Sequence, residues 1–123
     1  MGLDNFASST RGDVSLTPED ERAFVEAGIQ LCGSMSTDGI SSFRGKIYTV
    51  FVTEVTGESL SEEWLPPETV AGMADKLAAC DPDAAGEELD LYKDAVPSPF
   101  EIRCLQRFFR LCADRGLGLI GWS

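Results

Sequence analysis

Residues 46–55, KIYTVFVTEV, decide the fold class, because they fit both a strand and a helix. Their β-branched side chains favour a strand. A strand here would have apolar residues on both faces, however, and the chain offers few strands to pair with it. When the window is extended back to Ser36, apolar residues recur at helical spacing, as Ile40, Phe43, Ile47, Val50, Phe51 and Val55. We therefore predict a helix that ends at Gly57 as a left-handed cap.

Other helices are marked by their N-termini. Thr17 is a predicted N-cap followed by Pro18, and Ser98 with Glu101 forms a predicted capping box. We predict helices over residues 18–34, 38–56, 67–80 and 98–115. The expected fold is mainly α: a compact bundle of about four helices with a short extended C-terminal tail. An α+β fold with a strand near 46–55 is the alternative.

Length and composition indicate one domain. The chain has 123 residues, and its 43% apolar content is enough for one hydrophobic core. Residues 1–16 are rich in Ser, Gly, Asp and Asn, which predicts a flexible or late-docking N-terminal arm before a single helical domain over 17–123. The N-terminus lacks the basic and apolar regions of a signal peptide, and no long apolar run follows, so we expect a cytoplasmic protein without a membrane span.

The chain lacks the usual residues of catalytic and metal sites. It contains no histidine, which removes Ser-His-Asp and Cys-His arrangements. The loop from Asp81 begins like a calcium loop but has Tyr92 where the bidentate glutamate should stand. The cysteines have no Cys-x-x-Cys spacing and are predicted to be buried thiols: Cys32, Cys80, Cys104 and Cys112. We expect no enzyme activity, no cofactor and no metal; a small enzyme that uses only carboxylates or cysteine is the minor alternative.

Charge is strongly segregated along the chain. The formal net charge is −11, which disfavours nucleic acids and membranes as partners. Twelve acidic and only two basic residues lie between Glu54 and Asp94. This acidic stretch is either a solvated face or a surface that docks on a basic patch of another protein, and Trp64 within it is either a core residue or a hot spot with a polar rim.

These charges define the candidate binding residues. The predicted partner-binding residues are Glu58, Glu62, Glu63, Trp64, Asp81, Asp83, Glu87, Glu88 and Asp90. The last helix holds three of the ten basic residues on one side, at Arg103, Arg107 and Arg110. This arginine row either pairs with the acidic stretch across the bundle or is surface decoration.

Three phrases resemble bacterial immunity proteins, the cytosolic antidotes of secreted polymorphic or contact-dependent toxins, including those of type VI secretion. They are FRGKIY at 43–48, TGESL at 56–60 and CADRGLGLIGWS at 112–123, and the likeness covers roughly residues 40–65 and 98–123. It implies a non-catalytic protein that binds one cognate toxin and occludes or distorts its active site. Many such toxins are nucleases or nucleotide-modifying enzymes with basic clefts, which an acidic surface suits. We expect a monomer; the alternative is a small, acidic, dimeric secretion chaperone for an effector protein.

Overall fold

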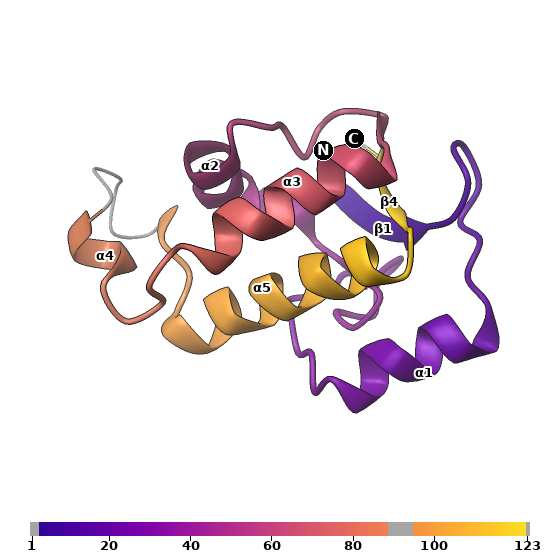
Figure 1. Cartoon of the computed structure of the whole chain (residues 1–123), viewed down its shortest axis with the longest axis horizontal. Coiled ribbons are helices and arrows are strands. Elements are labelled where there is room, and N and C mark those ends of the chain that lie inside the picture. Colours follow the sequence, from indigo (N-terminus) through magenta and orange to yellow (C-terminus); the bar gives the residue numbers. More distant parts are fainter. Residues whose placement is uncertain (1–2, 89–94, 123) are drawn as a thin grey trace.

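The computed structural model describes residues 3–88 and 95–122, which form an α+β fold (Figure 1). The strands are β1 (Asp4–Ser8), β2 (Ser42–Phe43), β3 (Trp64–Leu65) and β4 (Gly118–Trp122). The helices are α1 (Pro18–Glu26), α2 (Gly45–Thr56), α3 (Pro67–Ala78), α4 (Ala85–Glu88) and α5 (Pro99–Asp114). The predicted helical bundle is therefore wrong. The error does not lie in residues 46–55, which belong to α2 as predicted.

The sheet brings the two ends of the described chain together. Its order is β2-β1-β4-β3, and all neighbours are antiparallel. The inner strands β1 and β4 pair from Asp4 opposite Trp122 to Ser8 opposite Gly118. The edge strands β2 and β3 have two residues each, and such short edges limit pairing with other chains. The predicted C-terminal tail is thus an inner strand, and β1 lies within the segment that we assigned to an N-terminal arm.

The helix ends follow the sequence signals only in part. Thr17 and Ser98 complete the predicted capping boxes, and Gly57 ends α2 with a φ of 78° as predicted. α1 is shorter than predicted because Gly28 turns the chain with a φ of +72°. α2 starts at Gly45 and not at residue 38, because the carboxylate of Asp38 accepts hydrogen bonds from the next backbone N–H groups and holds a turn.

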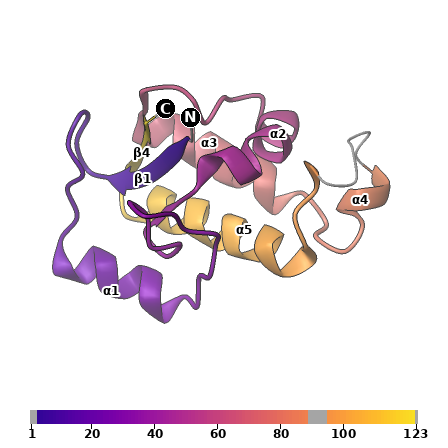
Figure 2. The ribbon, with the colours of Figure 1, turned by 180° about the vertical axis from the view of Figure 1, so that it is seen from behind.

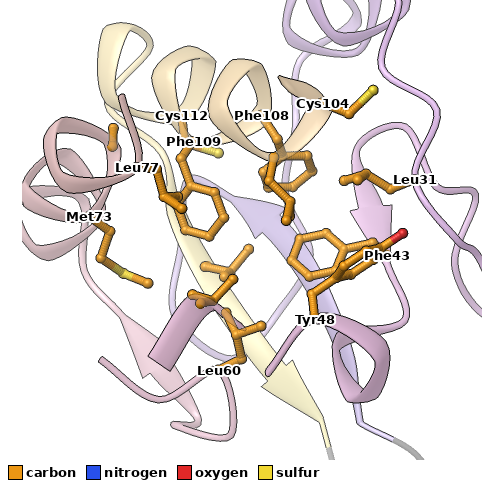
Figure 3. Packing of buried hydrophobic residues seen from close by; sticks show 14 of the residues in the cluster. Leu31, Phe43, Tyr48, Leu60, Met73, Leu77, Cys104, Phe108, Phe109 and Cys112 are labelled. Carbon is orange, nitrogen blue, oxygen red and sulfur yellow. The ribbon is translucent and has the colours of Figure 1, made fainter. Parts of the chain in front are cut away.

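The main core lies between the helices and one face of the sheet. α3 and α5 run side by side on the same side of β1 and β4 (Figures 1 and 2). Phe108 and Phe109 point from α5 toward the sheet (Figure 3). The ring centroid of Phe108 lies 5.0 Å from that of Phe43 and 5.1 Å from that of Phe24. Every described helix contributes at least one buried side chain to this core.

Buried hydrogen bonds join segments that are far apart in the sequence. The hydroxyl of Tyr48 accepts from the backbone N–H of Cys32 and donates to the carboxylate of Glu101, both at 2.7 Å. The side-chain amide of Asn5 donates to the carbonyl of Leu60 at 2.9 Å and to a carbonyl of β4 at 3.3 Å. These bonds fix the relative positions of the segments, although the Oδ1 atom of Asn5 is buried with no hydrogen-bond partner in the described structure.

Candidate partner-binding surface

The sheet turns one face to the helices and the other face away from them. Side chains alternate along a strand, so Ala7 and Leu119 enter the main core while Phe6 and Ile120 point to the opposite, outer face. Phe6 and Ile120 are nevertheless buried, and neither belongs to the main core. The outer face therefore has an apolar cluster of its own.

Three aromatic side chains flank Ile120 on this outer face. Phe6 and Trp64 are its register partners on β1 and β3, and Trp122 follows it two residues along β4. The rings of Phe6 and Trp122 lie 4.8 Å apart between centroids. Ile120 is 0% exposed, whereas Trp122 keeps 49% of its surface exposed. We call Phe6, Trp64, Ile120 and Trp122 the outer-face cluster.

Trp64 lies against the backbone of β4. A Cβ added to Gly118 would come within 2.5 Å of Cη2 of Trp64 and 2.6 Å of the carbonyl oxygen of Leu65. A glycine is therefore needed at position 118 for the indole of Trp64 to pack against the backbone of β4. Trp64 is half-buried, so one part of its surface packs on the sheet and another part meets solvent.

Carboxylates border the outer-face cluster at one end of the sheet. Asp4 is the register partner of Trp122, and Glu62 and Glu63 directly precede Trp64. Glu62 and Glu63 are exposed. We call Asp4, Glu62 and Glu63 the acidic rim. A negative rim around partly exposed indoles suits a partner that presents arginine or lysine together with apolar side chains.

The predicted partner-binding residues fall into separate groups. Glu62, Glu63 and Trp64 lie just before α3, whereas Asp81 and Asp83 follow its other end. α3 has twelve residues, so these groups are about 18 Å apart along its axis. Figure 1 shows the same separation, with α4 at one end of the molecule and the sheet toward the other.

The remaining predicted residues do not join the acidic rim. Glu58 is half-exposed just after α2, and Glu87 is exposed in α4. Glu88 ends α4, but its side chain is outside the described structure, as is all of Asp90. Among the predicted residues that the structure describes, Glu62, Glu63 and Trp64 are the ones that the strand pairing places beside the outer-face cluster.

The arginine row of α5 pairs with the acidic stretch at two positions, as one of the two interpretations predicted. Arg103 donates to both carboxylate oxygens of Asp83, at 2.9 and 2.8 Å, and Arg110 donates to Asp75 at 3.0 Å. Asp81 accepts from the backbone N–H of Asp83 at 3.0 Å and so caps a turn. These bonds explain why the segment that begins like a calcium loop is a turn held against α5.

Burial suppresses ionisation of two titratable side chains in the core, those of Cys112 and Tyr48. Of the four cysteines predicted to be buried thiols, Cys104 and Cys112 are buried, whereas Cys32 and Cys80 are only partly buried. Burial raises the pKa of Cys112. Burial and the neighbouring carboxylate of Glu101 raise the pKa of Tyr48 as well. Both groups stay protonated at neutral pH, which removes them as nucleophile or general base. Within residues 3–88 and 95–122, no group of three or more cysteine, aspartate or glutamate side chains is arranged to hold a metal ion.

Sequence reasoning missed Phe6, Ile120, Trp122 and Asp4. A signal was present, since GLIGW at 118–122 is a short apolar run, which is consistent with a strand buried on both faces. The two glycines hid this signal, because glycine is depleted in strands and typical of tails and turns. The outer-face cluster exists only once β4 is paired with β1 and β3.

Comparisons with known proteins do not suggest a function for this surface. No family model matches the chain, and neither a curated protein nor a solved structure is significantly similar to it. None of the helices in the described ranges is long and apolar enough to cross a bilayer.

Proposed function

We propose that the chain is a non-catalytic protein-binding module, an immunity protein that neutralises a cognate toxin by docking the outer-face cluster and its acidic rim on it. The observation that carries this proposal is a sheet face with two partly exposed tryptophans and a carboxylate rim. Tryptophan is enriched among the residues that dominate binding energy, especially where a polar rim surrounds it.

The rigid position of the cluster supports this role. Trp122 and Phe6 lie on the two inner strands, and Trp64 is held against Gly118. Side chains that are already ordered lose little conformational entropy on binding, so more of the contact energy is available as affinity. The packing of the cluster on the sheet therefore favours affinity.

Charge defines the kind of partner. With a net charge of −11, the chain attracts basic surfaces, and the acidic rim directs this attraction to the outer face. A toxin that acts on nucleic acids or nucleotides carries a basic cleft, which the rim would cover. An antidote of this kind acts in the cytoplasm of the cell that makes it.

The test is neutralisation of a toxin. The full chain is co-expressed with each toxin domain encoded beside its gene, and growth and co-purification are measured. One domain should lose its toxicity and elute with the chain at a fixed stoichiometry. If no neighbouring toxin is neutralised or bound, the proposal is wrong.

A secretion chaperone remains the second candidate, because an open sheet face also serves for dimerisation. Light scattering on the purified chain separates the two functions. We expect a monomer of 13.3 kDa. A dimer that retains an unfolded effector would favour the chaperone.

A further inference from the structure

A second surface lies on the opposite side of the molecule. A groove of about 640 Å³ runs along α5 between the C-terminal ends of α1 and α3. Its apolar lining includes Ala27 and Leu111, and its polar lining comes mainly from α5: Arg103, Gln106, Arg107 and Arg110. The main core separates this groove from the outer face of the sheet.

The groove concentrates positive charge on an acidic protein. Three of the ten basic residues line it, although the net charge of the chain is −11. The outer two, Arg103 and Arg110, are fixed by their bonds to Asp83 and Asp75. Arg107 stands between them, is exposed, and makes no hydrogen bond or ion pair in the part of the chain that the structure describes. The middle of the row is therefore open to an external anion.

The chain's own aspartates indicate which anion fits. Both outer arginines already bind a carboxylate, one of them through both oxygens. These pairs are exposed, and exposed ion pairs contribute little to stability, so an external carboxylate can exchange with either aspartate. Arg103 and Arg110 therefore bind carboxylates in a way that allows exchange.

The spacing of the row selects an extended ligand. Arg110 lies seven positions after Arg103, which is about 10 Å along a helix axis. A single phosphate group cannot bridge this distance. In an extended peptide, side chains on the same side are about 6.6 Å apart, so two or three alternate acidic residues span this length. The apolar lining offers contact area for the intervening residues.

We propose that this groove binds an extended acidic segment of a partner polypeptide, with one carboxylate on Arg107. The site is independent of the toxin-binding role, because it uses other residues on another face. A single protein could thus contact two partners, or two parts of one partner, at once.

The probe is a fluorescein-labelled peptide of alternating glutamate and alanine, titrated with the full chain and followed by fluorescence anisotropy at low salt. We expect saturable binding that Arg107→Ala weakens at least tenfold. The matched control is Arg22→Ala, which removes an exposed arginine from α1 outside the groove and should change the affinity less than twofold. A peptide of alternating glutamine and alanine should not bind. Circular dichroism establishes that both variants are folded.

Several results would overturn the proposal. The groove is not a peptide site if the glutamate peptide fails to bind, or if Arg107→Ala binds it as well as the unaltered chain. Equal losses in Arg107→Ala and Arg22→Ala would mean non-specific attraction. Displacement of the peptide by micromolar inorganic phosphate would assign the groove to small phosphate anions.

Discussion

At the scale of single residues, buried polar side chains hold segments that have no other reason to meet. Tyr48 connects α2 to α5 and to the loop before β2 through one hydroxyl group. Its partner Glu101 also closes the capping box of α5 with its other carboxylate oxygen. One short network thus fixes the start of α5 relative to two other parts of the core.

Tyr48→Phe tests this network. The backbone N–H of Cys32 and one oxygen of Glu101 lose their partner, and a buried unpaired polar group costs about 1–3 kcal/mol. Urea unfolding should show a loss of this size. The control is Thr53→Val, which lies on the same helix and removes an exposed hydroxyl that makes no hydrogen bond with described residues. It should change the free energy of unfolding by less than about 0.5 kcal/mol. Equal stability of Tyr48→Phe and the unaltered chain would show that the network is not stabilising.

Asp20 should make stability depend on pH. Burial opposes its ionisation, but hydrogen bonds from Arg115 and Thr17 outweigh burial and lower the pKa of Asp20 below its ordinary value of 3.8. A carboxyl group with a lowered folded-state pKa stabilises the fold above its unfolded-state pKa, and this contribution is lost as the pH falls through the folded-state pKa.

Asp20→Asn should therefore cost about 1.5 kcal/mol at pH 7, the lower range for hydrogen bonds to a charged group. The difference from the unaltered chain should shrink below about pH 4, where the carboxyl of the unfolded chain becomes protonated, and it should be lost as the pH falls through the lower folded-state pKa. Urea unfolding at pH 7 and pH 3 measures both values. A difference that stays constant with pH would contradict the role given to the ionised form.

At the scale of elements, helices were predictable and strands were not, for a physical reason. Helices carry local signals, so the caps at Thr17, Ser98 and Gly57 were recognised from neighbouring residues alone. β1, with the sequence DNFAS, buries Asn5, whose side-chain amide donates to the carbonyls of Leu60 and Ile120. A buried polar residue in a strand becomes understandable only when its distant partner is known.

Local sequence signals also failed to reveal β4 and the proposed binding surface. The two glycines of β4 are needed because other backbone or indole atoms approach them closely, as Trp64 approaches Gly118. Of the residues in the proposed binding surface, Trp64 and its two preceding glutamates were among the nine predicted from the sequence, because they stand in the acidic stretch. Phe6 and Trp122 join them through pairing between the ends of the described chain, which no local pattern reports.

Gly118→Ala tests the contact between β3 and β4. The added Cβ would displace Trp64 or the Leu65 carbonyl, and overpacking of this kind costs about 1–3 kcal/mol. Gly72→Ala is the control, because a Cβ at this position in α3 meets nothing within 4 Å and should stabilise the helix by about 0.5–1 kcal/mol. Thermal unfolding of both variants gives the comparison. If Gly118→Ala were as stable as Gly72→Ala, Trp64 would not lie where we describe it.

At the scale of the whole molecule, the two candidate surfaces lie on opposite sides of the core and differ in their charged side chains. The outer face is rimmed by carboxylates, and the groove along α5 is lined by arginines. Most of the remaining negative charge is spread over the surface, where it keeps the protein apart from other anionic molecules.

Reversal of the acidic rim tests whether charge directs association. Glu62→Lys with Glu63→Lys should slow association with the toxin domain at least tenfold at low salt and weaken its dependence on ionic strength. Glu26→Lys with Glu87→Lys makes the same change in net charge at exposed sites away from the rim, and it should have a much smaller effect. Stopped-flow association rates at two salt concentrations distinguish the pairs. Equal slowing would mean that net charge alone matters.

The dissociation constant of Trp122→Ala for the neutralised toxin domain tests the central claim most directly, with Phe100→Ala as the control. Both side chains are aromatic and 49% exposed, but Phe100 lies at the start of α5, outside the outer-face cluster. If the outer face is the binding surface, Trp122→Ala weakens binding about 30-fold or more, as expected for a hot spot, and Phe100→Ala leaves it within about twofold. Unchanged binding by Trp122→Ala, or an equal loss in Phe100→Ala, would contradict it.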